Sequence, residues 1–310
     1  MQRRPLGETG VEVPVLSFGT APLGGLFGAI DDADALRLVH VAIDLGMTFI
    51  DTSPYYGSAE ERLGRALGPR RDKVLLGTKA GRFGLADFDF SPARIRSSLE
   101  QSLRLLRTDH IDVFQLHDVE FVPLDGVLTD AFAELVRLRD EGTCRFIGMT
   151  GYPLASMARV VAETEVDVVL TYAHDTLLDS SLSEDLAPIA REHGVGLINA
   201  AAVALGLLTP RGSGITSADH PATAAIHAAA DDMRAVCARA GADLAFLANQ
   251  YSIQRTAAAT TLVGTRSSAH LRAAVAAAST PVDEELLSAV LALRPPAGER
   301  TWPSGLPENN

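Results

Sequence analysis

The chain has 310 residues, of which 47% are hydrophobic, and its formal net charge is −12 at pH 7. This acidic balance makes nucleic acid an unexpected partner. No apolar stretch is long enough to span a bilayer, and the N-terminus lacks the apolar run of a secretory signal. The two cysteines, Cys144 and Cys237, form no motif. These features predict a reduced, cytoplasmic protein without a membrane partner.

Short apolar runs alternate with amphipathic stretches along most of the chain. Residues 3–16 come first and predict a β-hairpin that turns between Gly7 and Gly10. Eight apolar runs then predict strands at 15–20, 48–52, 74–79, 111–117, 144–150, 166–172, 195–200 and 260–265. These runs are apolar nearly throughout, which is typical of parallel strands covered on both faces.

A helical stretch follows each predicted strand. The one after the third strand begins at Ser91, a good N-cap, with Pro92 at the first helical position. Its apolar residues recur at spacings of three and four and form one buried face: Ile95, Leu99, Leu103 and Leu106. Other expected helices cover residues 32–45, 59–67, 128–139, the alanine-rich stretch 222–240, and 281–293.

Eight strand–helix units predict an α/β fold of the (β/α)8 TIM-barrel type. We expect one domain over residues 1–310, with an N-terminal β-hairpin, an extra C-terminal helix and an irregular tail from about residue 295. A doubly wound sheet is the alternative, but it should carry G-x-G-x-x-G after its first strand, and neither "GTAPLGG" nor "GGLFG" fits.

Polar residues stand at the ends of three successive predicted strands. The second strand ends in Asp51, the third in Lys79 and the fourth in His117. Tyr55 and Tyr56 lie in the loop after the second strand. Each residue alone is more often structural, as a loop cap, a solvated cation or a satisfied histidine. Because barrel enzymes place their chemistry at this end of the strands, the combination favours one shared site.

These residue types are suited to proton transfer. A free tyrosine has a pKa of about 10, and a nearby lysine ammonium favours the phenolate and lowers that pKa. Asp51 can supply the counter-charge that a buried lysine needs, and a neutral histidine can orient a substrate oxygen. The residue types do not decide between Tyr55 and Tyr56. No member of the set takes up two electrons, so hydride chemistry requires a cofactor.

Four long motifs carry a resemblance to a known family. They are "GTAPLGG", "AIDLGMTFIDTSPYYGSAEERLGRAL", "SPARIRSSLEQSLRLLRTDHIDVFQLHD" and "LGLLT". Over about residues 1–295 the chain resembles the aldo-keto reductase family, and within it the branch of D-threo-aldose (L-fucose) 1-dehydrogenases and pyridoxal 4-dehydrogenases. The resemblance implies four catalytic residues, namely Asp51, Tyr56, Lys79 and His117. The family spacing selects Tyr56 over Tyr55.

The resemblance also implies an extended nicotinamide dinucleotide across the top of the barrel. The matching positions are Gly19, Thr20, Asp51, Thr150, Leu205, Gly206, Gly264, Thr265, Arg266 and His270. Thr150 matches a carboxamide contact, whereas Leu170 replaces a glutamine common in the family. Gly206 permits close approach of the pyrophosphate.

The segment that would meet an adenosine 2′-phosphate departs from the family pattern. Gly264 replaces a lysine common in NADP-preferring members, His270 replaces an arginine, and Ala273-Ala274 replaces a Glu-Asn pair. Arg266 remains able to meet a phosphate. The cofactor is therefore expected to be NAD or NADP, with NAD somewhat favoured.

The resemblance predicts hydride transfer between the cofactor and C1 of an aldose such as L-fucose, with Tyr56 as general acid and base. A pyridoxal or general aldehyde enzyme is an alternative, and specificity would lie in loops 22–29 and 82–89 and in the tail. A non-catalytic regulatory subunit is an alternative of another class. A barrel metal hydrolase is disfavoured, because "HD" occurs at 117–118 and 174–175 without any H-x-H pair, and no metal is expected. The sequence does not indicate the oligomeric state.

Overall fold

The computed structural model describes residues 1–26, 28–209 and 220–310. Its centre is a closed barrel of eight parallel strands in the order β10-β3-β4-β5-β6-β7-β8-β9. The strands are β3 (Leu16–Gly19), β4 (Phe49–Asp51), β5 (Leu75–Ala80), β6 (Ile111–Leu116), β7 (Cys144–Thr150), β8 (Val168–Tyr172), β9 (Gly196–Ala200) and β10 (Thr260–Val263). The predicted (β/α)8 barrel is thus confirmed, with a strand overlapping each of the eight expected runs.

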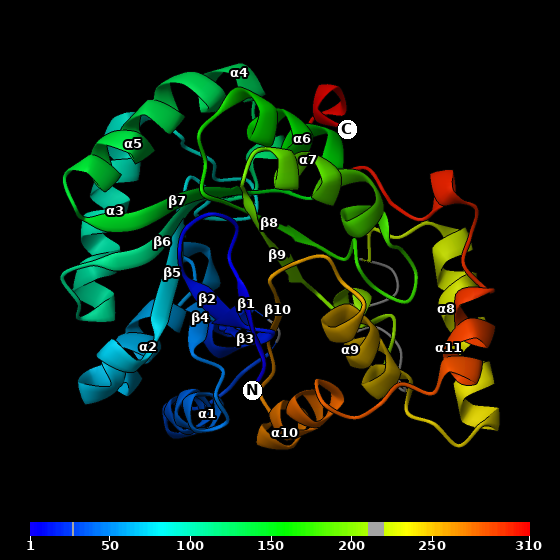
Figure 1. Ribbon diagram of the computed structural model, residues 1–310. Coiled ribbons are helices and arrows are strands. Elements are labelled where there is room, and N and C mark those ends of the chain that lie inside the picture. The colour runs from blue at the N-terminus through cyan, green and yellow to red at the C-terminus, as the bar shows by residue number, and fades with distance from the viewer. Residues whose placement is uncertain (27, 210–219) are drawn as a thin grey trace.

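Helices surround the barrel (Figure 1). They are α1 (Asp32–Asp44), α2 (Ala59–Leu67), α3 (Pro92–Leu106), α4 (Leu124–Gly126), α5 (Phe132–Asp140), α6 (Leu154–Glu163), α7 (Ala187–Glu192), α8 (Ala224–Arg239), α9 (Leu244–Gln254), α10 (Ser268–Ala277) and α11 (Glu284–Leu291). Two predicted helices begin later than expected because a side chain caps them. Thr223 accepts from the backbone of Ile226 at the start of α8, and Asp283 accepts from Leu286 at the start of α11.

The predicted hairpin, β1 (Arg3–Pro5) and β2 (Glu12–Pro14), closes the N-terminal end of the barrel. It crosses the front of the barrel in Figure 1. Leu6 and Val13 are fully buried and pack with Phe49 and Val113 from the barrel interior. This end of the barrel is therefore filled with apolar side chains, and the opposite end is left for polar groups.

Strand register decides which residues face the interior above this apolar layer. Side chains alternate along a strand, and Phe49 points inward. Asp51, two residues further along β4, therefore points inward too. By the same alternation Val113 places Gln115 on the interior side of β6. Polar side chains from neighbouring strands thus meet in one layer near the C-terminal end of the barrel.

The C-terminal tail returns to the barrel after α11. Trp302 is buried, and its ring stacks on that of Tyr152 with 4.7 Å between centroids. Two short 3-10 turns, Ala297–Glu299 and Pro307–Asn309, are the regular elements there, which agrees with the predicted irregular tail. The C-terminus lies close to α6 in Figure 1.

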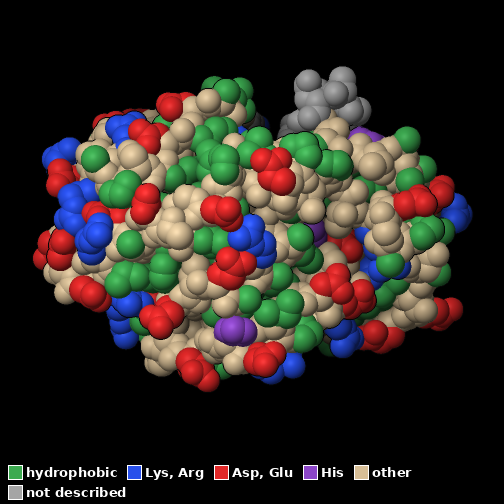
Figure 2. Space-filling model, turned by 90° about the horizontal axis from the view of Figure 1, so that it is seen from above, with side chains coloured by type: hydrophobic (Ala, Val, Ile, Leu, Met, Phe, Trp, Pro, Cys, Tyr) green, Lys and Arg blue, Asp and Glu red, His purple; other side chains and the backbone are tan. Residues whose placement is uncertain are grey.

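The surface mixes charges of both signs. In Figure 2, Lys and Arg side chains are interspersed with Asp and Glu over the face shown. Within the described ranges, no helix is both long enough and apolar enough to cross a membrane. Phe27, in the loop where we expected specificity, lies outside the described residues.

Candidate active site

Asp51 and Lys79 form a buried ion pair at the C-terminal end of the barrel. Lys79 Nζ contacts Asp51 Oδ1 and donates to the carbonyl oxygen of Thr52 at 2.8 Å. The side chain of Lys79 is 1% exposed and that of Asp51 is 3% exposed. Burial raises the pKa of Asp51, and the Lys79 ammonium opposes that rise. The predicted pairing of these two residues is confirmed.

Tyr56 is held above this pair by a tight turn. The 3-10 helix Pro54–Tyr56 begins at Ser53, whose Oγ accepts from the backbone N–H of Tyr55 at 3.1 Å. Gly57 follows with φ +59°. Gly24 packs so closely that a Cβ there would lie 1.4 Å from the Tyr56 carbonyl oxygen. Packing from both sides thus fixes the backbone that presents the phenol.

The structure contradicts one expectation about Tyr56. Lys79 Nζ lies 5.2 Å from the centre of its ring, yet the pKa of the phenol is raised well above 10. Burial is the largest cause, and the charges of Asp51 and Asp118 add to it, while Arg82 opposes it. The phenol is therefore protonated, because burial outweighs the opposing charge of Arg82. It is ready to donate a proton rather than to accept one.

His117 lies beside Tyr56 as a neutral imidazole. The ring centroids are 5.6 Å apart and nearly perpendicular. Burial lowers the pKa of His117 to about 3. Ser53 Oγ lies 2.8 Å from Nδ1. The Ser53 hydroxyl can donate to Nδ1, and Nε2 lies 3.7 Å from the acceptor Asp118 Oδ2. We therefore assign the proton of the imidazole to Nε2.

Arg82 and Asp118 form a second ion pair beside the tyrosines, which the sequence analysis did not single out. Arg82 Nη1 contacts Asp118 Oδ2, and Nη2 donates to the Tyr55 hydroxyl at 3.3 Å. Burial alone would raise the pKa of Asp118, but the charge and hydrogen bond of Arg82 bring it below its ordinary value. Each lies two residues after a strand end, of β5 or β6, and that position could have identified them. Tyr55 is thus tied to the site by its hydrogen bond with Arg82.

Strained backbone marks the loop after β9, where the pyrophosphate is expected. Ala201, Ala204 and Leu205 have φ of 56°, 46° and 53°, and Gly206 has φ of 106°. Left-handed conformations are costly for residues with a Cβ and tend to mark functional sites. The N–H groups of Ala204, Gly206 and Leu207 already donate to carbonyl oxygens within the loop, so the pyrophosphate contact stays a prediction.

The start of α10 offers a second anion-binding feature on the same end of the barrel. Ser267 caps the helix, and Thr265 Oγ1 lies 3.2 Å from His270 Nδ1. Arg266 Nη1 donates to the Ala29 carbonyl oxygen at 3.0 Å and remains exposed. The side chain of Arg266 therefore reaches across the β3–α1 loop. Its contact with a 2′-phosphate stays a prediction.

The other predicted cofactor residues differ in their burial and in their hydrogen-bond partners. Thr20 is buried, and its hydroxyl donates to the Asp51 carbonyl oxygen at 3.1 Å. A Cβ on Gly264 would lie 2.8 Å from the Gly19 carbonyl oxygen. The absence of a side chain at Gly264 therefore lets the backbone after β10 pack closely against the end of β3. Thr150 Oγ1 is already engaged with Asp118, accepting from its N–H at 2.9 Å and donating to Oδ1 at 3.2 Å. The expected carboxamide contact would compete with these bonds.

Glu120 anchors the C-terminal tail beside the site. Its Oε1 accepts from Ser304 Oγ at 3.0 Å, and its carbonyl oxygen accepts from Leu306 N–H at 2.9 Å and Asn309 Nδ2 at 2.8 Å. Oε2 is buried without a partner among the described residues. Burial, with help from the charge of Asp118, raises the pKa of Glu120 to about 8.

We expect Glu120→Gln to change how stability depends on pH. Since the folded-state pKa lies above the ordinary value of 4.5, folded Glu120 binds more protons than unfolded Glu120 between these values. Its ionisation therefore destabilises the wild type progressively as the pH rises from 4.5 to about 8. Glutamine stays neutral, so the variant should lack this decline. Thermal unfolding from pH 5 to 9 measures the difference, and parallel curves for the two proteins would contradict it.

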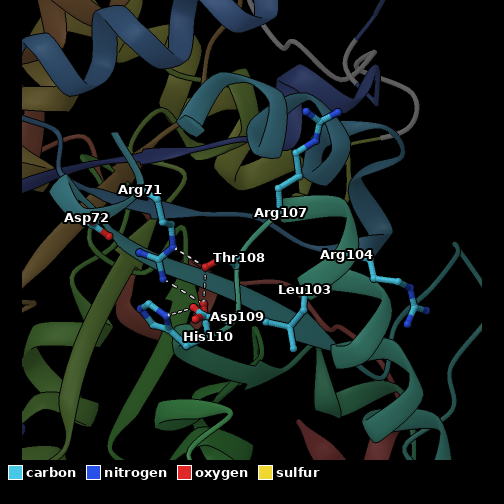
Figure 3. A pocket seen from close by; sticks show the side chains of 8 residues that line it. All are labelled: Arg71, Asp72, Leu103, Arg104, Arg107, Thr108, Asp109 and His110. Carbon is cyan, nitrogen blue, oxygen red and sulfur yellow. Dashed lines mark hydrogen bonds and ion pairs between the residues drawn. The ribbon is translucent and has the colours of Figure 1, made fainter. Parts of the chain in front are cut away.

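A surface cavity of about 560 Å³ lies at the opposite end of the barrel. Figure 3 shows its lining residues from the segments that precede β5 and β6. Arg71 points inward and donates to Thr108 Oγ1 at 3.0 Å and Asp112 Oδ2 at 2.9 Å. Arg104 and Arg107 point away from each other. Arg71 also donates to the His110 carbonyl oxygen at 3.0 Å, so these polar groups already satisfy one another. We therefore place the active site at the tetrad instead.

The described ranges hold no cluster of three or more His, Cys, Asp or Glu side chains arranged for a metal ion. The second "HD" pair is structural. His174 is buried, with Nε2 2.6 Å from the Tyr152 carbonyl oxygen. Asp175 contacts the hydroxyls of Ser183 and Thr256.

Comparisons with known proteins identify the family of the chain. The model of the aldo/keto reductase family matches residues 15–294. L-galactose dehydrogenase from Arabidopsis thaliana is 39% identical over 322 residues, covering 100% of this chain and 99% of the relative. D-threo-aldose 1-dehydrogenase from Pseudomonas sp is 32% identical over 225 residues, covering 64% and 68%.

The fold comparison leads to the same family. The solved structure of aldo-keto reductase AKR11C1 from Bacillus halodurans, in its holo form, matches with a TM-score of 0.78. The two chains are 25% identical, and the match covers 100% of this chain and 99% of the other. The chain therefore belongs to the aldo/keto reductase family, a family of oxidoreductases that use NAD(P)H.

Proposed function

We propose that this enzyme transfers a hydride between a nicotinamide dinucleotide and C1 of an aldose. The observation that carries the proposal is the buried Asp51–Lys79 pair beneath Tyr56, with neutral His117 beside it. When bound, the dinucleotide supplies the hydride acceptor or donor. The two strained and capped segments after β9 and β10 would hold its pyrophosphate and its adenosine end.

The residues of the chain would move the proton. In aldehyde reduction, the protonated Tyr56 hydroxyl donates to the carbonyl oxygen as the hydride arrives at carbon. His117 donates from Nε2 to the same oxygen and orients it. In the oxidative direction the path reverses: Tyr56 takes the proton of the anomeric hydroxyl, and a lactone forms. Lys79 stabilises the phenolate that this step requires.

The second ion pair favours a polyhydroxylated substrate. Arg82 has several donors, and Asp118 offers acceptor oxygens next to His117, whose Nε2 lies 3.7 Å from Asp118 Oδ2. Sugar hydroxyls both donate and accept, so they match such a pair better than an apolar aldehyde does. A sugar would accordingly be oriented by Arg82 and Asp118 while C1 meets Tyr56.

Sugars that differ at one position give the sharpest substrate test. L-galactose, L-fucose and D-arabinose share their configuration at C2 to C4 and differ in the group on C5, which is CH2OH, CH3 or H. We expect all three to be oxidised, with kcat/KM varying by no more than about 100-fold, because each lost group removes one set of contacts. D-galactose, with the mirror-image configuration, should react far more slowly. The absorbance of reduced nicotinamide measures each rate with NAD and with NADP.

The same panel separates the alternatives. Strong reduction of pyridoxal or simple aldehydes without any oxidation of aldoses would favour the general aldehyde enzyme. No turnover of any substrate with either cofactor would favour the non-catalytic subunit. We propose NAD as the somewhat better cofactor, because Gly264 and His270 replace the cations common in NADP-preferring relatives; a lower KM for NADP would contradict this.

A further inference from the structure

Gln115 contacts the catalytic ion pair although it lies outside the tetrad. It stands on β6, two strands from Asp51 on β4. Its Nε2 donates to Asp51 Oδ2 at 3.0 Å, while Lys79 contacts the other carboxylate oxygen, Oδ1. Each oxygen of Asp51 therefore has its own side-chain donor, one neutral and one charged. Sequence reasoning missed Gln115 because it lies inside a predicted strand rather than at its end.

Two glycines make this contact across three strands possible. Gly77 on β5 pairs in register with Asp51, and a Cβ there would lie 3.1 Å from Asp51 Oδ2. Gly148 on β7 pairs in register with Gln115, and a Cβ there would lie 3.2 Å from Gln115 Cγ. Both distances are tighter than ordinary packing. The missing side chain of Gly77 leaves room on β5 for the amide to reach the carboxylate. The missing side chain of Gly148, where a Cβ would lie 2.6 Å from Val168, leaves room beside Gln115.

The orientation of the amide depends on the ionisation of Asp51. Gln115 is fully buried, and its Oε1 has no partner among the described residues. Leaving a buried acceptor unpaired costs free energy, which the bond from Nε2 to a carboxylate offsets. If Asp51 carried a proton, the amide could turn and accept that proton through Oε1. The observed arrangement therefore favours the ionised carboxylate.

We propose that Gln115 is a positioning residue that keeps Asp51 ionised and in place, and thereby holds the Lys79 ammonium beneath Tyr56. The role rests on the proposed function, but the contacts can be tested without a substrate. The charged or titratable groups that interact with Asp51 are Lys79 on β5 and Tyr56 above it. Its neighbours in register, Gly19 and Gly77, carry no side chain.

The composition of the chain offers a direct measurement. Lys73 and Lys79 are its only two lysines, so protein labelled with 13Cε-lysine gives two lysine signals in NMR. On the acid side, the Lys79 signal should show a step when Asp51 takes up a proton, while exposed Lys73 serves as an internal reference. In Gln115→Met, which keeps the length but removes the donor, we expect this step to move to higher pH by about one unit.

Steady-state kinetics provide a second test, with whichever substrate the wild-type enzyme turns over. We expect Gln115→Met to lower kcat ~10-fold with little change in KM, because the lost bond acts on proton transfer rather than on substrate binding. Gln250→Met is the matched control, since this buried glutamine donates to the carbonyl oxygens of Thr280 and Pro281, far from Asp51. The control should leave both the NMR step and kcat unchanged.

Gly77→Ala provides a second variant if Gln115→Met does not fold. Its methyl group would displace Asp51 Oδ2 from Gln115, so the step should move in the same direction. An unchanged step in the folded variant overturns the positioning role, even in an enzyme that oxidises sugars. Conversely, the Lys79 NMR step could move as expected while the wild type turns over no sugar or aldehyde. That result would count against the proposed function and leave the positioning of Asp51 supported.

Discussion

Tyr56→Phe should reduce turnover by about 10²- to 10⁴-fold, the range typical for loss of a general acid or base. The substitution removes the hydroxyl and leaves the ring, so the contacts with His117 and the Lys79 ammonium persist. No bond from the Tyr56 hydroxyl to another described residue accompanies them, and stability should change little. Steady-state rates in both directions, with thermal unfolding beside them, measure the effect.

Tyr55→Phe is the matched control for this substitution. Tyr55 is the adjacent residue in the same turn, and its hydroxyl receives one bond from Arg82 at 3.3 Å. Its loss should cost at most several-fold in kcat, since Arg82 keeps its partner Asp118. Equal losses in the two variants would show that the turn, and not the Tyr56 proton, matters.

Lys79→Met is expected to damage both stability and activity. Removing one partner of a buried ion pair leaves Asp51 unpaired, which costs about 3–5 kcal/mol in the free energy of unfolding. Asp51 would escape part of this cost by taking up a proton, and the cation that stabilises the phenolate would be gone. We expect kcat to fall by at least ~100-fold. Denaturant unfolding and kinetics on the same preparation measure the two losses.

A double variant separates the two effects of Lys79. Asp51→Asn combined with Lys79→Met removes the uncompensated charge, so it should recover much of the lost stability without recovering turnover. Lys73→Met changes the exposed lysine before β5 and should affect neither property. If Lys79→Met kept wild-type turnover, the ion pair would be structural and the proposed proton path would be wrong.

The barrel could be predicted because its strands are covered on both faces. Parallel strands of this kind read as apolar runs, and polar residues such as Asp51 and Lys79 stand out where the runs end. The family spacing then selected Tyr56. Helix starts were less certain where a capping side chain, such as Asp283, decides the first residue. The predicted start at Leu128 was wrong in detail, because a π-helical turn over Val127–Ala131 follows α4; we have no physical account of that turn.

The supporting contacts could not be predicted in the same way. Ser53 meets His117, and Gln115 meets Asp51, across 64 positions in each case. Which side chains meet inside the barrel depends on strand register, and no local pattern encodes it. The pKa of Tyr56 was misjudged for a related reason: the sequence shows which charges are near, but only the structure shows that burial outweighs them.

Gly77 and Gly148 lie on strands, in the layer of the barrel beneath the loops of the rim. Asp51, Lys79 and Gln115 lie on strands, whereas Arg82 lies in the loop after β5 and Trp302 in the C-terminal tail. Exchanging those segments would alter which molecules are admitted while leaving the acid–base apparatus intact. An engineer seeking new substrates should therefore diversify loop 82–89 and the tail, and should keep these two glycines fixed.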